Sequence, residues 1–157
     1  MTDSKIIPIL NYEEGYKESP YLDTQGFPTV AGGIRIGPKN ANLSNYTFIV
    51  PRTVGDIWKK TIVDQKVIDM GQYQSIASAM AASNQPRRDV LISMAYQMGV
   101  DGLAGFKNTL AMIAAGDFGS AANGMLNSLW AKQTPNRARR HADVMRTGTY
   151  DIYKGLI

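Results

Sequence analysis

Two acidic residues and a threonine near the N-terminus have the types and spacing needed for acid–base chemistry. Glu14 ends a helical pattern, Asp23 opens a turn nine residues later, and Thr29 lies six residues further, on the returning segment. Cleavage of a glycosidic bond needs a protonated carboxylic acid at the leaving oxygen and a carboxylate that activates water or stabilises positive charge. A nearby hydroxyl can orient the water. Carboxylates beside a turn are also common as solvated or capping residues, so the pattern alone leaves both interpretations open.

The composition leaves few other groups for such chemistry. The 157 residues include no cysteine, one histidine and thirteen aspartates and glutamates. Disulfide scaffolds, thiol nucleophiles and cysteine-based zinc sites are thereby excluded. A single histidine provides no pair for a metal, and we expect neither a metal nor a cofactor. Glu13 is the alternative acid to Glu14, and we expect it to be a solvated neighbour.

The net charge of +4 lies entirely in the second half of the chain. Residues 1–84 carry eight basic and eight acidic side chains, whereas residues 85–157 carry nine basic and five acidic ones. This favours a polyanionic partner such as a bacterial envelope, although an ordinary solvated surface explains it equally well. The basic residues are too sparse for a dedicated nucleic-acid reader. We expect Arg137 and His141, both in this segment, to face solvent.

The elements that must position the three candidate residues form a small α+β segment. Apolar residues at helical spacing predict a first helix, and Gly15 is a plausible terminator for it. A turn over residues 23–26 with short strands around it predicts a small antiparallel sheet, which has too few strands to stand alone.

The remainder of the chain is expected to be helical. A pattern beginning at Thr53 predicts a long amphipathic helix with Trp58 on its apolar stripe. No apolar run reaches the roughly 20 residues of a membrane span, so we expect no membrane insertion. The predicted fold class is α+β, mostly helical, as one domain over 1–157. Its predicted parts are a small lobe over 13–52, a connecting helix over 53–71, and a helical lobe over 72–157 on which helix 1–12 packs.

The sequence around the candidate residues resembles the catalytic region of the T-even phage lysozymes, the phage-type muramidases of glycoside hydrolase family 24. The matching runs are Tyr12-Glu13-Glu14-Gly15, the stretch from Tyr21 to Gly33, Tyr96-Gln97-Met98-Gly99, Gly105-Phe106-Lys107-Asn108, Gln133-Thr134-Pro135-Asn136-Arg137-Ala138 and Arg146-Thr147-Gly148-Thr149. The likeness covers nearly the whole chain and is loosest between residues 35 and 85. It implies a lysozyme-like two-lobe fold.

The resemblance also implies a role for each matching residue. Glu14 corresponds to the general acid, Asp23 to the carboxylate that positions water or stabilises the sugar cation, and Thr29 to the hydroxyl that holds the water. The corresponding substrate-binding residues are Tyr96, Gln97, Asn108 and Thr109. The implied reaction is hydrolysis of the β-1,4 bond between N-acetylmuramic acid and N-acetylglucosamine of bacterial peptidoglycan, generally with inversion. The implied enzyme is a monomer that works without a cofactor.

Four positions depart from the family pattern. Ile34 stands where relatives have histidine, and Ala31 replaces the first glycine of the Thr-x-Gly-x-Gly run. Gly124 replaces an asparagine and Leu129 an arginine, so contacts with saccharide or stem peptide are expected to differ. At Ala31 we expect the backbone not to take a positive φ readily.

The biological role implied by the resemblance is that of an endolysin. Residues 1–5 lack the basic region of a signal peptide, so we expect accumulation in the host cytoplasm and holin-dependent access to the periplasmic peptidoglycan. The alternatives are a tail-associated lysozyme, a non-catalytic peptidoglycan-binding relative and a lytic transglycosylase.

Overall fold

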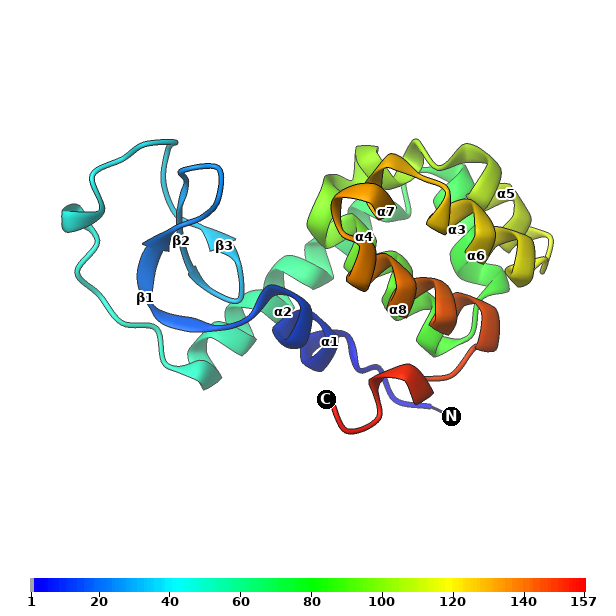
Figure 1. Ribbon diagram of the computed structural model, residues 1–157, viewed down its shortest axis with the longest axis horizontal. Coiled ribbons are helices and arrows are strands. Elements are labelled where there is room, and N and C mark those ends of the chain that lie inside the picture. The colour runs from blue at the N-terminus through cyan, green and yellow to red at the C-terminus, as the bar shows by residue number, and fades with distance from the viewer. Residues whose placement is uncertain (1) are drawn as a thin grey trace. The chain divides into compact units, whose positions relative to one another are not determined.

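The computed structural model describes residues 2–157, and these fold into two compact units (Figure 1). We call Ile7–Ile62 the sheet unit, and Val63–Ile157 together with the residues before Ile7 the helical unit. The described residues form eight α-helices, a three-stranded antiparallel sheet and two 3-10 helices. The predicted fold class, α+β and mostly helical, is confirmed. None of the helices among residues 2–157 is long and apolar enough to cross a membrane.

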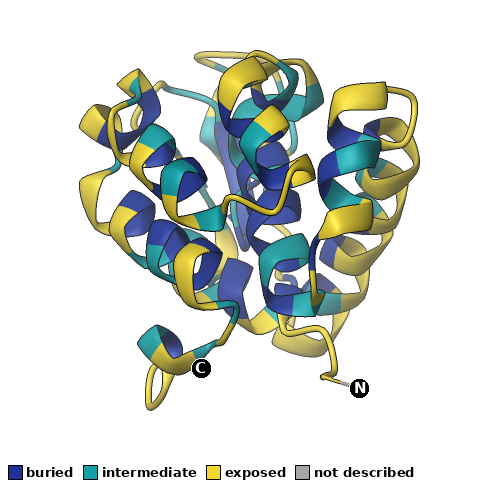
Figure 2. Cartoon of the chain, turned by 90° about the vertical axis from the view of Figure 1, so that its right-hand side faces the viewer, coloured by how far each residue is buried: buried dark blue, intermediate teal, exposed yellow. Residues whose placement is uncertain are grey.

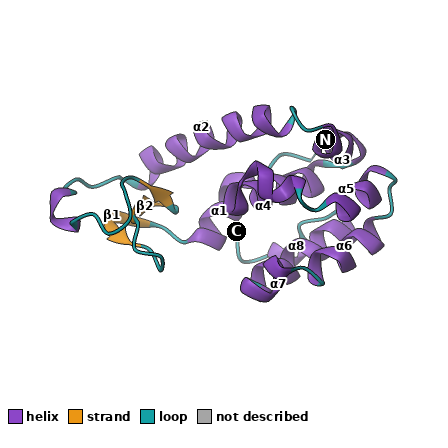
Figure 3. Ribbon diagram, turned by 90° about the horizontal axis from the view of Figure 1, so that it is seen from above, coloured by secondary structure: helices purple, strands orange, loops and turns teal. Residues whose placement is uncertain are grey.

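The sheet unit consists of one helix, three short strands and the start of a long helix. In chain order its elements are α1 (Ile6–Glu14), β1 (Lys17–Leu22), β2 (Pro28–Ala31), β3 (Ile34–Arg35), the 3-10 helix η1 (Leu43–Asn45) and the first part of α2 (Arg52–Met70). The strands, orange in Figure 3, pair in the order β1-β2-β3, both pairs antiparallel. Pro28 is tolerated in the central strand because it is the first residue of β2, a position that proline can occupy. Its carbonyl accepts a hydrogen bond from Ile36 N.

The last residue of β2 holds a backbone conformation that the sequence did not predict. Ala31 has φ +55°, so the expectation that alanine would not readily take a positive φ is wrong. The side chain of Ala31 is buried in a small apolar cluster with Val30, Ile34 and Val50. We attribute the conformation to this packing, which offsets the strain that left-handed backbone causes in a non-glycine residue.

The long helix α2 forms as predicted, but its apolar stripe does not face the core. Val54 and Ile57 are 53% and 69% exposed, and Trp58, which lies on the same stripe, is 38% exposed. The fully buried residue on this part of the helix is Lys59. Lys59 can be buried because its ammonium donates a hydrogen bond to Asn11 Oδ1 at 2.6 Å. This bond offsets part of the cost of removing the charge from water.

The helical unit contains the end of α2 and six further helices. They are α3 (Gln74–Ala82), α4 (Gln85–Ala104), α5 (Lys107–Ala114), α6 (Phe118–Leu126), α7 (Leu129–Gln133) and α8 (Pro135–Thr147), followed by the 3-10 helix η2 (Asp151–Tyr153). Buried and exposed residues alternate around these helices, which therefore present one side to the core (Figure 2). Asp117 caps the N-terminus of α6 by accepting a hydrogen bond from Ser120 N at 3.1 Å, and Gly148 ends α8 in a left-handed conformation.

Two charged or polar residues of α8 lie in the core instead of facing solvent. His141 is fully buried and Arg137 is 6% exposed, so the expectation of a solvated cluster is wrong. The ring of His141 contacts Ser93 Oγ at 2.8 Å and the Tyr153 hydroxyl at 3.0 Å, and Arg137 donates to the same Ser93 Oγ at 2.9 Å. Positions four apart share a helix face, and on this face Ser93 of α4 provides the polar partner. Burial lowers the pKa of His141 well below its usual range, and the nearby positive charges of Arg137 and Arg140 lower it further.

Candidate active site

Glu14, Asp23 and Thr29 all lie in the sheet unit, each in or next to a different element. Glu14 is the last residue of α1, Asp23 follows β1, and Thr29 lies on the central strand β2. Gly15 releases the chain from α1 in a left-handed conformation, φ +70°, which glycine adopts without a steric penalty. Between Glu14 and Thr29 the chain leaves α1, forms β1, turns and enters β2.

The Glu14 carboxyl group packs on the turn between β2 and β3. A Cβ added to Gly33 would lie 3.1 Å from Glu14 Oε2, and Gly33 has φ +82°. Glycine at this position therefore leaves space for the Glu14 side chain and adopts the left-handed backbone that the turn requires. Glu14 itself is partly buried.

The Asp23 carboxylate is held by three hydrogen-bond donors. Its Oδ1 accepts from the backbone N–H groups of Gln25 and Phe27, both at 2.9 Å, while its Oδ2 accepts from Arg35 Nε at 3.1 Å. The backbone N–H groups and the Arg35 guanidinium hold the pKa of Asp23 below its ordinary value. Asp23 is therefore fixed in position and ionised at neutral pH.

Thr29 is 2% exposed and belongs to a row of side chains that crosses the sheet. It pairs with Tyr21 on β1 and with Arg35 on β3, and directly paired residues of antiparallel strands point to the same face. Its hydroxyl donates to the Phe27 carbonyl at 2.9 Å. The oxygen keeps its lone pairs for other donors.

Tyr21, the partner of Thr29 on β1, is a further residue of this region that was not predicted from the sequence. Burial raises the pKa of its hydroxyl, and the negative charges of Glu14 and Asp23 raise it further. Tyr21 pairs with Thr29, so their side chains lie on the same face of the sheet. The three predicted residues therefore lie on neighbouring elements of one unit. Predicting that Tyr21 and Arg35 pair with Thr29 requires the strand register. The turns predicted on either side of β2 do not fix that register.

The four residues proposed as substrate contacts lie in the helical unit. Gln97 is partly buried and accepts a hydrogen bond from Trp130 Nε1 at 2.8 Å, whereas Asn108 is exposed at the start of α5. Thr109 is 7% exposed, and its hydroxyl occupies the space beside Gly124, 2.7 Å from an added Cβ. Tyr96 is partly buried. Their contact with substrate remains a prediction.

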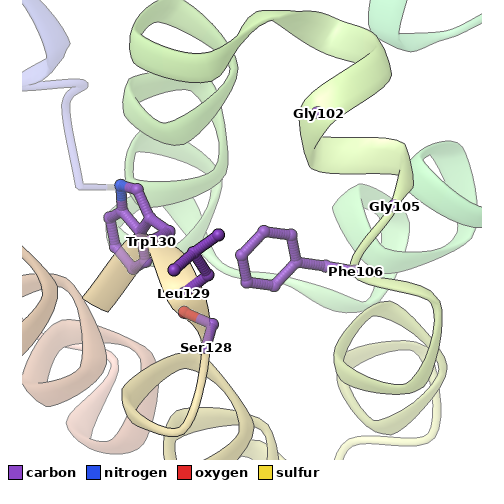
Figure 4. A pocket seen from close by; sticks show the side chains of 6 residues that line it. All are labelled: Gly102, Gly105, Phe106, Ser128, Leu129 and Trp130. Carbon is purple, nitrogen blue, oxygen red and sulfur yellow. The ribbon is translucent and has the colours of Figure 1, made fainter. Parts of the chain in front are cut away.

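The helical unit also contains an apolar pocket (Figure 4). It has a volume of about 340 Å³ and is lined by Gly102, Gly105, Phe106, Ser128, Leu129 and Trp130. The rings of Phe106 and Trp130 meet nearly at right angles, with centroids 6.3 Å apart. Leu129, one of the four departures from the family pattern, is 69% exposed at this pocket. The arrangement offers an apolar surface with one polar group at Ser128.

Within residues 2–157, no group of three or more histidine, aspartate or glutamate side chains could hold a metal ion. The candidate residues of the sheet unit offer the two carboxyl groups of Glu14 and Asp23 and the hydroxyls of Thr29 and Tyr21. One carboxylate, Asp23, is held ionised by its donors. Such a set can carry out proton transfer and orient water.

Comparison with known proteins identifies relatives along almost the whole chain. No protein-family model matches it. The chain is 31% identical over 172 residues to "Probable T4-type lysozyme 1" of Dictyostelium discoideum, covering 96% of this chain and 99% of that protein. "Probable T4-type lysozyme 2" of the same organism is 28% identical over 169 residues, with the same coverage. The "Pre-baseplate central spike protein Gp5" of Enterobacteria phage T4 is 27% identical over 162 residues, and the chain spans 28% of its length. With full-length similarity to a T4-type lysozyme, the chain belongs to the T4-type lysozyme family and is a glycoside hydrolase.

Proposed function

We propose that the protein hydrolyses the β-1,4 bond between N-acetylmuramic acid and N-acetylglucosamine in bacterial peptidoglycan, with Glu14 as the general acid. The observation that carries the proposal is an Asp23 carboxylate held by three donors, one turn before Thr29, in a chain of the T4-type lysozyme family. Asp23 and Glu14 have different surroundings, since three donors bind Asp23 whereas Glu14 packs on the Gly33 turn. Different environments are what allow two carboxyl groups to take different roles.

The proposed step is a displacement by water. Glu14 transfers its proton to the bridging oxygen as the bond from that oxygen to the muramic acid C1 breaks. The water oxygen forms the new bond to C1, and its proton passes to Asp23 and then to solvent, from which Glu14 regains a proton. Because its pKa is lowered, Asp23 is a weak proton acceptor. Its main contributions are to orient the water, with the Thr29 hydroxyl, and to stabilise positive charge on the sugar. Attack from the face opposite the leaving group inverts the anomeric centre.

Two biological settings are consistent with this reaction. The first is an endolysin that accumulates in the host cytoplasm and reaches the periplasmic peptidoglycan through a holin-dependent lesion, lysing the host cell. The second is a tail-associated lysozyme, which is favoured by the similarity to a phage pre-baseplate spike protein. Sedimentation of phage particles distinguishes them, because a tail-associated enzyme co-sediments with the particle and an endolysin does not.

The role of Glu14 is tested by comparing Glu14→Gln with Glu13→Gln. The two glutamates are adjacent on α1 and both are partly buried, so the variants are matched in charge and in extent of burial. Muropeptide release from purified peptidoglycan should fall at least about 100-fold in Glu14→Gln, since general acid catalysis contributes about 10²–10⁴-fold. It should stay near the wild-type rate in Glu13→Gln, and both variants should keep a melting temperature close to wild type.

Release at the wild-type rate by Glu14→Gln would refute the assignment. A non-catalytic peptidoglycan-binding protein would show no turnover in any of the three proteins. The anomeric form of the first product, followed by NMR on a soluble glycan, tests inversion separately.

A further inference from the structure

Arg35, in the two-residue strand β3, makes three contacts around Asp23. Its Nε donates to Asp23 Oδ2 at 3.1 Å and its Nη2 donates to Gln25 Oε1 at 2.9 Å. The guanidinium carbon lies 4.1 Å from the centre of the Phe27 ring, a cation–π contact. These contacts hold the planar guanidinium between the ring of Phe27 and the turn that contains Asp23 and Gln25.

The backbone places Arg35 in register with the candidate water-binding hydroxyl. Arg35 pairs with Thr29 across β2 and β3, so both side chains project from the same face of the sheet. Asp23 lies beyond the end of β1, beside the same row. Arg35 therefore links the turn that carries Asp23 to the strand that carries Thr29.

The contacts of Asp23 leave little freedom in how its carboxylate can meet a water molecule. A carboxylate has about four acceptor sites, two on each oxygen. On Oδ1, two are used by Gln25 N and Phe27 N; on Oδ2, one is used by Arg35 Nε. The remaining acceptor site is on Oδ2, and its direction is fixed by the bond to Arg35 together with the two backbone bonds to Oδ1.

We propose that Arg35 is a positioning residue for hydrolysis: it orients Asp23 Oδ2 so that the remaining acceptor site receives the attacking water beside Thr29. The inference rests on the proposed function, in which Asp23 orients that water. Arg35 does not touch the reacting atoms and acts through Asp23. The positive charge also contributes to the lowered pKa of Asp23, so the charge and the geometry of Arg35 have separable consequences.

Two substitutions separate these consequences. Arg35→Leu removes both the positive charge and the planar guanidinium group that binds Asp23 and Gln25. Arg35→Lys keeps a charge close to Asp23 but cannot bind Asp23 and Gln25 with a fixed planar group. The matched control is Arg52→Leu, because Arg52 is exposed to a similar extent, pairs with Asp56 at 3.6 Å and stacks on Tyr16 within the same unit. Arg52→Leu changes the net charge by the same amount as Arg35→Leu.

The measurements are kcat and KM on a soluble glycan as a function of pH, together with a carbon-13 NMR titration of the Asp23 carboxyl group. We expect kcat of Arg35→Leu to fall about 10- to 100-fold, the size of effect that misplaced reacting groups produce. The acidic limb of its pH profile and the Asp23 titration should both move to higher pH. In Arg35→Lys the limb should return towards wild type while kcat stays reduced. Arg52→Leu should match the wild type in both.

The contradicting results are distinct from those that would overturn the proposed function. If Asp23→Asn hydrolyses the glycan at the wild-type rate, the role of Asp23 is wrong and the role of Arg35 falls with it. If Asp23→Asn is inactive but Arg35→Leu keeps the wild-type kcat, only the inference about Arg35 is refuted. The same conclusion follows if Arg35→Lys restores kcat fully, because charge alone would then account for the effect.

Discussion

The substitution Gly32→Ala should destabilise the protein strongly, because the buried ammonium of Lys59 occupies the space that an added methyl group needs. A Cβ at Gly32 would lie 1.7 Å from Lys59 Nζ and 2.3 Å from Lys59 Cε. Ordinary non-bonded contacts are about 3.5–4.0 Å, so the ammonium must move by roughly 2 Å. A lysine side chain is flexible, but Lys59 is fully buried and its Nζ is bonded to Asn11 Oδ1 at 2.6 Å.

The expected cost has two parts. Overpacking a closely packed core costs about 1–3 kcal/mol, and losing a hydrogen bond to a buried charged group costs about 1.5–3 kcal/mol. The free energy of unfolding should therefore fall by about 2.5–6 kcal/mol. For a chain of this length, that loss lowers the melting temperature by about 5–24 °C.

Differential scanning calorimetry of Gly32→Ala measures this effect, with Gly119→Ala as the control. Gly119 is exposed on α6 and an added Cβ would meet no atom within 4 Å, so this change should be neutral or stabilise by up to about 1 kcal/mol. Combining Gly32→Ala with Lys59→Met should give a smaller loss than the sum of the single variants, because the clashing ammonium is absent. A melting temperature of Gly32→Ala within about 2 °C of wild type, or strict additivity, would refute this account of Lys59.

Three other expectations concern pH, capping and backbone strain. The unfolded chain protonates His141 near pH 6.5 while the folded chain keeps it neutral, so stability is fully present above that pH and is lost on acidification. Urea denaturation should show the wild type losing up to about 1.4 kcal/mol more per pH unit below 6.5 than His141→Leu, and parallel pH dependences would contradict this. Asp117→Ala removes the side-chain cap of α6 and should cost about 1 kcal/mol in the same assay; an unchanged denaturation midpoint would exclude the cap as a stabilising contact. Ala31→Gly should stay within about 1 kcal/mol of wild type, because relief of left-handed strain offsets a lost buried methyl group, whereas Ala95→Gly inside α4 has no such relief and should cost about 2 kcal/mol.

The parts of the site that were predictable from sequence depend on local signals. Gly15 after Glu14 marks a helix end, and the Asp23 turn has the residues that such turns require. These features act over a few residues and need no knowledge of distant contacts. The placement of Glu14, Asp23 and Thr29 on successive elements of one unit follows from these signals.

The residues that escaped prediction depend on partners far away in the sequence or on strand register. His141 lies in a polar run that resembles an exposed helix face, yet Ser93, 48 residues earlier, and Tyr153 accommodate it in the core. Arg35 contacts Asp23, 12 residues earlier, across a sheet whose register the sequence does not fix. Trp58 belongs to a regular apolar stripe, but the buried side of α2 is occupied by Lys59.

The chemical outcome of the reaction tests the central claim most directly. Purified peptidoglycan is digested with the wild-type protein in water enriched in heavy oxygen, and the released muropeptides are analysed by mass spectrometry. Hydrolysis by the proposed route predicts N-acetylmuramic acid at the reducing end, carrying one heavy oxygen atom from water. Unlabelled products ending in anhydro-N-acetylmuramic acid, or label at N-acetylglucosamine reducing ends, would contradict the proposed reaction.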